Sequence, residues 1–334
     1  MKMKSLVLAV ATGAVMAASA IAQETAQEPV FWRIGTGGAG GTYFPIGGLI
    51  ANAISNPPGA RACDEGGSCG VEGLVAIAVS TNASVANMNA VNSGQLDAGL
   101  AGGLAVADGF AGTGDFEGNA RDKVRAIGAL YPEDLHLVLA EGLEVNSLTD
   151  LSGLRVGVGA AGSGTQVSVR AILSAFGVEA EEFELNLGQS TDRLADGQID
   201  AFFYGGGWPF AALIQLGANK GFELYSFSPE EVEKILDTVD VYVPSTIPTG
   251  AYENITHDVS TVASPAILVT NIDQDEELIF QITQALWSDE TRALLDKGHA
   301  KGKQIRLETA LGGITIPLHP GAERFYREQG MIEN

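Results

Sequence analysis

A strand, a glycine-rich loop and a helix follow one another twice in this chain, and this repetition limits the possible folds more than any other feature. In the first copy, the apolar strand Val30 to Ile34 leads into the loop Gly35 to Thr42 and then into an amphipathic stretch. The second copy begins about 120 residues later, with the strand Leu154 to Val158 and the loop Gly159 to Thr165. Such a unit is typical of α/β folds with parallel strands.

A second signature follows each module in the same order. Residues Gly94 to Ala98 read Gly-Gln-Leu-Asp-Ala, and residues Gly197 to Ala201 read Gly-Gln-Ile-Asp-Ala. The two repeats together predict two α/β lobes, each a mostly parallel sheet flanked by helices. Because ligands bind in the crevice outside the carboxyl ends of parallel strands, we expect a ligand cleft between the lobes.

The first residues have the features of a secretory signal. Lys2 and Lys4 precede an apolar run from Leu6 to Met16, and small residues continue to Ala22. We expect a signal peptide over residues 1–22, cleaved after Ala22, and therefore an exported, periplasmic protein. The apolar run is shorter than the roughly 20 residues that a membrane span needs, which makes an anchor the less favoured alternative.

Length and charge narrow the function classes further. Removing the leader from 334 residues leaves enough chain for two modest domains. The sequence has 19 Lys and Arg against 41 Asp and Glu, a formal net charge of −22, and loss of the two leader lysines brings the mature chain to about −24. A charge of this sign excludes nucleic acids as partners and argues against anionic membrane surfaces.

Export places the two cysteines, Cys63 and Cys69, in an oxidising compartment. We expect a disulfide between them that closes a short surface loop and stabilises the fold by about 2 kcal/mol at most. A metal site is disfavoured, because the four histidines show no ligand spacing that would complete a site with the two thiols. We therefore predict no metal and no cofactor.

Three motifs suggest other functions, and their context argues against each. Gly35, Gly37 and Gly40 have the spacing of a dinucleotide loop, but no acidic residue follows at the distance that ribose binding requires. The second glycine loop lacks the lysine of a phosphate loop, and Gly66 to Gly70, which matches Gly-x-Ser-x-Gly, lacks a preceding strand. Nothing in the sequence pairs His136 with a nucleophile, so we expect a protein that is not an enzyme.

The glycine loops remain candidates for anion binding, because each leads into a helix start where unpaired N–H groups and the helix dipole favour a carboxylate. A third candidate is Ser80 to Asn87, where small polar residues precede a helical pattern. Additional hydroxyl and aromatic contacts are available from Thr36, Thr42, Ser163, Thr165, Tyr43, Tyr204 and Trp208. The alternative is that glycine only permits the turns and the polar groups only cap helices.

Six segments occur in a characteristic order: Ile34 to Pro45, Ser80 to Asn92, Ala129 to Glu133, Gly162 to Thr165, Asp200 to Phe203 and Ile316 to Tyr326. Together they resemble the TAXI-type solute receptors of tripartite ATP-independent periplasmic (TRAP) transporters, from about Phe31 to Gly330. The resemblance implies a monomeric, type II-like two-lobed periplasmic binding protein. It would capture a small organic acid or amino acid, such as glutamate, glutamine or 2-oxoglutarate, and deliver it to a sodium-coupled membrane permease.

The resemblance also implies which residues form the site. The first lobe would contribute Thr36, Gly37, Gly38, Thr42 and Tyr43, with Ser84 and Asn87 as further donors. The second lobe would hold a carboxylate with Gly162, Ser163, Gly164 and Thr165. Relatives often have Thr-Gly-Gly-Ser where this chain has Thr81-Asn82-Ala83-Ser84, and Gly205 to Trp208 looks particular to this branch, so the exact solute stays open.

Two crossings between the lobes are expected, at Tyr131 to Glu133 and near Val243 to Pro248. With the C-terminal part returning to the first lobe, as the resemblance implies, the first lobe comprises residues 23–132 plus 247–334 and the second comprises residues 133–246. Two alternatives to a transport receptor stay open: a receptor that reports to a membrane-bound sensor, and an exported enzyme.

Overall fold

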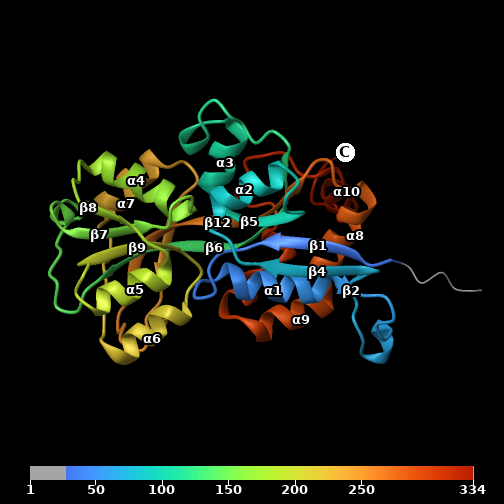
Figure 1. Ribbon diagram of the computed structural model, residues 1–334, viewed down its shortest axis with the longest axis horizontal. Coiled ribbons are helices and arrows are strands. Elements are labelled where there is room, and N and C mark those ends of the chain that lie inside the picture. The colour runs from blue at the N-terminus through green and yellow to red at the C-terminus, as the bar shows by residue number, and fades with distance from the viewer. Residues whose placement is uncertain (1–27, 334) are drawn as a thin grey trace, which may run out of the picture.

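A computed structural model describes residues 28–333, so the predicted signal peptide and its cleavage site lie outside the described residues. The chain forms two lobes that lie side by side along the long axis of the molecule (Figure 1). Within the described part, no helix combines the length and the apolar character that crossing a membrane would require.

The first lobe, at the right of Figure 1, contains the first copy of the repeat and the C-terminal helices. Its elements are β1 (Val30–Gly35), α1 (Tyr43–Ile54), β2 (Ser55–Asn56), β3 (Val71–Glu72), β4 (Leu74–Val79), α2 (Ser84–Asn92), β5 (Ala98–Gly102), α3 (Gly103–Ala111), α8 (Glu276–Leu286), α9 (Asp289–Gly298) and α10 (Pro320–Glu328).

The second lobe, at the left, contains the second copy. Its elements are β7 (Arg155–Gly159), α4 (Gly164–Phe176), β8 (Glu181–Glu184), α5 (Leu187–Ala195), β9 (Ala201–Gly206), α6 (Ala211–Asn219), β10 (Glu223–Leu224), α7 (Pro229–Thr238) and β11 (Val243–Ile247).

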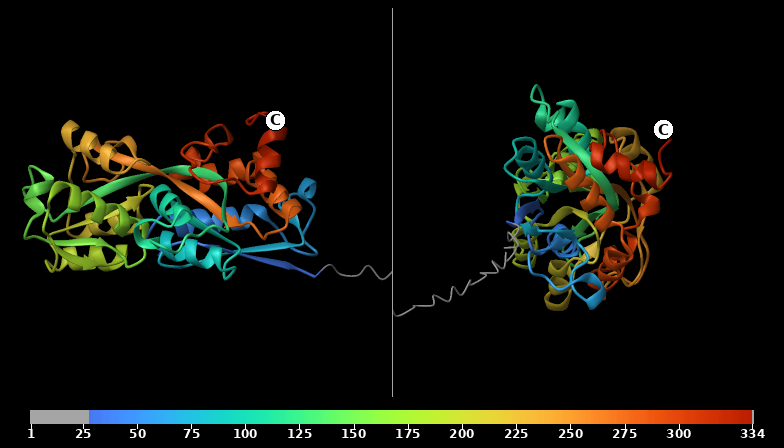
Figure 2. Two further views of the ribbon diagram at one scale, coloured as in Figure 1. Left: turned by 90° about the horizontal axis from the view of Figure 1, so that it is seen from above. Right: turned by 90° about the vertical axis from the view of Figure 1, so that its right-hand side faces the viewer.

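Two long strands, β6 (Val124–Leu139) and β12 (Val259–Asn271), join the lobes into one ten-stranded sheet. The main strand order is β4-β1-β5-β12-β6-β9-β7-β8, with β10 paired to β6 and β11 paired to β12. Seen from above, β12, drawn in orange, passes from one lobe into the other (Figure 2). The predicted α/β architecture of two lobes, each with a mostly parallel sheet flanked by helices, is confirmed.

The sheet order is symmetric about its centre, as the sequence repeat predicts. Strands β4, β1 and β5 are parallel to one another on one side, and β8, β7 and β9 are parallel on the other. The aspartates of the second signature play equivalent parts: Asp97 accepts from the backbone N–H and guanidinium of Arg33, and Asp200 does the same for Arg155. The signature therefore fastens neighbouring parallel strands in each lobe.

Local sequence explains where α4 begins and ends. The sequence predicts a capping box of Ser163 with Gln166, three positions on, and a helix end at Gly177. The Ser163 side chain accepts a hydrogen bond from the N–H of Gln166, and Gly177 ends the helix with φ of 64°. The Gln166 side chain does not complete a capping box, because its Oε1 accepts from Gly162 and its Nε2 donates to Glu184. The inward face of the helix is apolar and packs on the sheet, with Val169, Ile172 and Leu173 buried.

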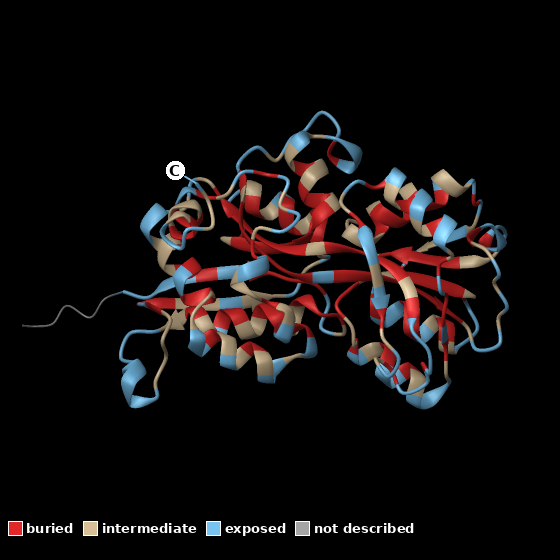
Figure 3. Ribbon diagram, turned by 180° about the vertical axis from the view of Figure 1, so that it is seen from behind, coloured by how far each residue is buried: buried red, intermediate tan, exposed pale blue. Residues whose placement is uncertain are grey.

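Apolar side chains fill both faces of the sheet in each lobe, and the buried residues follow the central strands (Figure 3). Where β6 and β12 pass between the lobes, Glu133 on β6 lies opposite Ser264 on β12. The neighbouring pair is Pro132 and Pro265. Residues 247–259 contribute to a core of the second lobe, with Ile247, Tyr252, Ile255 and Val259 buried there. The lobe boundaries remain a prediction, and this packing leads us to propose the second one near Pro265, later than residue 247.

The predicted disulfide is confirmed. Cys63 and Cys69 are bonded, with their Cα atoms 4.7 Å apart, and the bond closes a short turn in the segment between β2 and β3. This segment extends away from the body of the first lobe in Figure 1. The Gly-x-Ser-x-Gly match, Gly66 to Gly70, lies in the same segment.

Candidate ligand-binding site

A cavity of about 60 Å³ lies between the lobes. Its walls come from loops and helix starts of both lobes and from the two hinge strands. The lining residues are Gly37, Gly38, Thr42, Tyr43, Ala83, Ser84, Gly102, Leu104, Ala105, Glu133, Ser163, Gly164, Thr165, Ser168, Tyr204, Gly205, Gly206, Tyr242 and Ser264. Eight residues predicted from the sequence are therefore brought together: Gly37, Gly38, Thr42, Tyr43, Ser84, Ser163, Gly164 and Thr165.

Four helices begin at this cavity: α1, α2, α3 and α4. In the described chain only α4 among them has a side-chain cap; the starts of α1, α2 and α3 have none. The N–H groups of the first turns keep their capacity to donate, and no partner is found among residues 28–333 for those of Gly164 and Thr165. Helix dipoles add positive potential, so a negatively charged group in the cavity would be stabilised.

The lobes touch each other around the cavity. The Thr42 hydroxyl donates to the carbonyl of Gly207 at 2.5 Å, and the N–H of Ala86 donates to the carbonyl of Gly162 at 3.3 Å. The start of α4 also lies close to the start of α2, since a Cβ added at Gly164 would be 2.6 Å from the Ser84 hydroxyl oxygen. These contacts hold the cavity closed in this arrangement.

Glu133 introduces a carboxyl group into this positive environment. The residue is 8% exposed, and its Oε2 accepts a hydrogen bond of 2.9 Å from the Tyr43 hydroxyl. Burial raises the pKa of Glu133 to about 8, against a smaller opposing effect of the bond from Tyr43. Of the described residues that line the cavity, none is Lys, Arg or His, so Glu133 is the one acidic or basic side chain apart from tyrosines.

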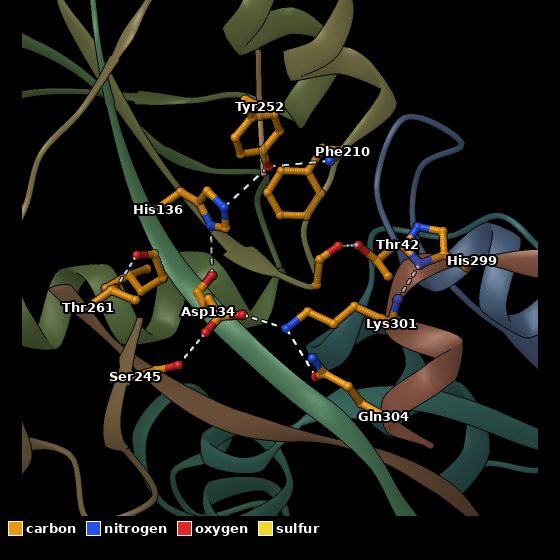
Figure 4. Close-up of polar contacts among 12 residues, drawn as sticks. Thr42, Asp134, His136, Phe210, Ser245, Tyr252, Thr261, His299, Lys301 and Gln304 are labelled. Carbon is orange, nitrogen blue, oxygen red and sulfur yellow. Dashed lines mark hydrogen bonds and ion pairs between the residues drawn. The ribbon is translucent and has the colours of Figure 1, made fainter. Parts of the chain in front are cut away.

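A buried ionic network supports the hinge beside the cavity (Figure 4). Lys301, in the 3-10 helix η4 (Ala300–Gln304), contacts Asp134 on β6 with Nζ 2.7 Å from Oδ2, and the Ser245 hydroxyl donates to Oδ1 at 2.5 Å. The imidazole of His136, also on β6, lies next to this pair, with Nδ1 2.9 Å from the carbonyl oxygen of Asp134. Burial lowers the pKa of His136 to about 4, so the ring is neutral and structural at neutral pH.

Four predicted site residues do not line the cavity. Thr36 donates its hydroxyl to the carbonyl of Val79, so it braces the first glycine loop. The amide of Asn87 donates to the carbonyls of Thr36 and Leu100, which uses both of its donors within the protein. Gly162 contacts α2 through its carbonyl, and the Trp208 ring lies 4.5 Å from Nζ of Lys301.

Sequence reasoning did not select several residues that the fold brings to the cavity: Gly102, Glu133, Ser168, Tyr242 and Ser264. Glu133 belongs to the expected crossing between lobes and to the segment Ala129 to Glu133 that carries the resemblance, but it was not predicted as a site residue. Its position next to Pro132, where β6 passes between the lobes, is the signal that could have placed it at the cleft. The others come from the end of β5, the interior of α4, the turn before β11 and the middle of β12, and their relation to the cleft depends on tertiary packing.

One group of three potential metal ligands occurs among residues 28–333, namely Cys63, Cys69 and Glu290. Both sulfurs of this group are bonded to each other in the disulfide. The group is therefore not suited to binding a metal ion while the disulfide is intact.

Comparison with solved structures gives similar folds at low sequence identity. A protein from Bordetella bronchiseptica RB50 is 15% identical with a TM-score of 0.50, covering 90% of this chain and 82% of that one. An ancestral arginine-binding protein bound to arginine is 17% identical, with a TM-score of 0.49 and coverage of 81% and 98%. The alkanesulfonate-binding protein SsuA from Xanthomonas axonopodis pv. citri, bound to MOPS, is 14% identical, with a TM-score of 0.44 and coverage of 90% and 84%.

These likenesses concern the fold alone. Family assignment comes from a family model that matches residues 34–330, which include both lobes, both hinge strands and every residue that lines the cavity. The chain belongs to the NMT1-like family.

Proposed function

We propose that this protein is a periplasmic solute-binding receptor of the TAXI type that serves a TRAP transporter. It captures a small organic acid or amino acid, of the glutamate, glutamine or 2-oxoglutarate class, between its two lobes. Closure of the lobes then presents the solute to a sodium-coupled membrane permease. No covalent step is part of this function.

The observation that carries the proposal is the convergence of four helix starts on one cavity between two lobes. Unpaired N–H groups at a helix start favour a carboxylate, and an enclosed site strengthens each hydrogen bond because water is excluded. The cavity of about 60 Å³ has room for only a few water-sized molecules, so the lobes must separate to admit an amino acid and then close around it less tightly than in this arrangement. The TAXI assignment rests on the sequence resemblance.

A thermal-shift screen of the mature protein against organic acids and amino acids tests the proposal. A ligand present at 100 times its dissociation constant stabilises the folded state by about 2.7 kcal/mol, which raises the unfolding temperature measurably. We expect stabilisation by at least one small carboxylate of the proposed class. Absence of stabilisation by every compound of that class, with protein freed of co-purified solute, would contradict the proposal.

Replacing Gly164 tests the contribution of the α4 start. In Gly164→Val the new side chain meets Ser84 across the closed lobes, where even a Cβ lies 2.6 Å from the hydroxyl oxygen. We expect the solute affinity, measured by calorimetry, to fall about tenfold or more. Gly48→Val is the matched control, because a Cβ at Gly48 in α1 meets nothing within 4 Å. Equal affinities for the two variants would remove the α4 start from the site.

A further inference from the structure

The cavity combines two opposite electrostatic features. Four helix starts make it favourable for an anion, yet Glu133 places a carboxyl group among them and no basic side chain lines the described walls. A ligand with negative groups alone would therefore be stabilised at the helix starts but repelled by Glu133 whenever that carboxyl group is ionised. A ligand with one negative and one positive group can satisfy both.

The geometry of Glu133 leaves half of its carboxyl group for a ligand. Oε2 accepts from the Tyr43 hydroxyl, whereas no group in the described part of the chain donates to Oε1. The carboxyl also packs against the start of α3, since a Cβ at Gly102 would be 2.9 Å from Oε2. A carboxylate buried to this extent is unstable without a partner, so it either holds a proton or pairs with a cation.

The neighbours of Glu133 do not supply that cation. Lys301 is the basic residue whose charge acts on Glu133, and its ammonium group is bonded to Asp134 and Gln304. The carboxylate of Asp134 raises the pKa of Glu133 further. The remaining titratable groups that affect Glu133, or are affected by it, are hydroxyls on four different elements or loops: Tyr43, Tyr131, Tyr204 and Tyr242. Burial raises the pKa of each of these tyrosines, so they are neutral around pH 7 and cannot balance a carboxylate.

We propose that Glu133 is the specificity-determining residue of the cavity and that it pairs with an ammonium group of the ligand. The ligand is then a zwitterionic amino acid, with its carboxylate at the helix starts and its amino group at Oε1 of Glu133. A dicarboxylate that lacks an amino group is disfavoured. This inference rests on the proposed receptor function and selects one part of the solute class named there.

Pairing with an ammonium group also predicts release of a proton. Because the pKa of Glu133 is about 8 in the empty site, the carboxyl group is mostly protonated at pH 7. Binding of an ammonium group lowers that pKa, so about one proton per ligand leaves at pH 7. A dicarboxylate that accepted a hydrogen bond from protonated Glu133 would raise the pKa instead, and binding would take up protons at pH 9.

Calorimetry with L-glutamate, L-glutamine and 2-oxoglutarate separates these outcomes when it is repeated in phosphate and Tris, whose ionisation enthalpies differ. For the unmodified protein we expect binding of an amino acid with proton release at pH 7. Glu133→Gln should lose the proton release and bind amino acids roughly ten- to hundredfold more weakly, since a hydrogen bond between charged groups is replaced by a neutral one. The same variant should bind 2-oxoglutarate at least as well as the unmodified protein does.

Glu231→Gln is the matched control. Glu231 is a glutamate of similar burial, 7% exposed, on α7 in the second lobe and outside the cavity lining. This variant should retain the affinity, the preference for amino acids and the proton release. Thermal unfolding of both variants confirms that they are folded before they are compared.

Two results would overturn the inference, and they differ in what they say of the receptor function. Tight binding of 2-oxoglutarate that weakens in Glu133→Gln, with proton uptake at pH 9, would keep the receptor function and reject the ammonium pairing. Absence of binding by all three solutes to the unmodified protein would reject both.

Discussion

At the scale of single residues, Ala83 has a backbone conformation that a residue with a side chain rarely adopts. It precedes α2 at the cavity wall with φ of 67° and ψ of −141°, and it is the one non-glycine residue with positive φ between residues 28 and 333. Only glycine adopts such a conformation without strain, which costs about 1–3 kcal/mol for other residues. This chain therefore has a residue with a side chain beside the cavity where the backbone conformation favours glycine.

We expect Ala83→Gly to increase the free energy of unfolding by about 1 kcal/mol. Relief of the strain exceeds the entropy that an added glycine loses on folding, which is about 0.4–1 kcal/mol. Ala90→Gly in the same helix, α2, should have the opposite sign and destabilise by about 1 kcal/mol, because a helix interior favours alanine. Chemical denaturation of the two variants measures both effects, and destabilisation by Ala83→Gly would contradict the assignment of strain.

At the scale of elements, the contact between η4 and β6 fixes the hinge. The side chains of Lys301 and Asp134 are 2% and 1% exposed, and Nζ lies 2.7 Å from Oδ2. On the surface, Nζ of Lys123 lies at the same distance from Oδ2 of Asp273, and these side chains are 52% and 66% exposed. The buried pair also has hydrogen bonds to Ser245 and Gln304, so the comparison shows what burial within a hydrogen-bonded network does to an ion pair.

Lys301→Met should lower the free energy of unfolding by about 3–5 kcal/mol, because it leaves the buried carboxylate of Asp134 without its cation. Lys123→Met should leave the stability almost unchanged, because water and salt screen an exposed pair. Denaturant unfolding of the two variants under the same buffer checks this difference. Similar effects of the two substitutions would show that burial of the hinge pair has no special importance for stability.

At the scale of the whole molecule, two long strands connect lobes that touch through few polar contacts. The bond from Thr42 to the carbonyl of Gly207 crosses the cleft directly, whereas β6 and β12 provide a continuous hinge. A small number of contacts across a hinge is suited to an equilibrium between open and closed states that a solute shifts. The size of the cavity, about 60 Å³, makes such opening necessary for solute entry.

Thr42→Val should shift this equilibrium toward the open state when no solute is present. Loss of one hydrogen bond of about 1 kcal/mol changes the ratio of states by about fivefold, since 1.4 kcal/mol corresponds to tenfold. The radius of gyration from small-angle X-ray scattering should therefore exceed that of the unmodified protein. Thr238→Val, which removes a hydroxyl bonded within α7, is the control and should leave the radius unchanged. Identical radii for Thr42→Val and the unmodified protein would argue against this bond as a closing contact.

The sequence by itself determined those features that depend on neighbours along the chain. The cap at Ser163, the left-handed end of α4 at Gly177 and the disulfide between Cys63 and Cys69 are set by a few adjacent residues, and each was predicted. The repeated strand, loop and helix also indicated two lobes, because such a unit has few ways to pack. These are local or repeated patterns, which sequence periodicity reports directly.

Only the tertiary structure decided which polar groups face the ligand and which brace the protein. Asn87 and Thr36 belong to the predicted motifs, yet their side-chain donors bond to carbonyl groups of neighbouring strands and loops. Glu133 was not among the predicted site residues, yet the crossing of β6 brings it to the cavity beside Tyr43, 90 positions away in sequence. Which partner a polar side chain bonds to depends on contacts between segments that are distant in sequence. No pattern along the chain predicts these contacts.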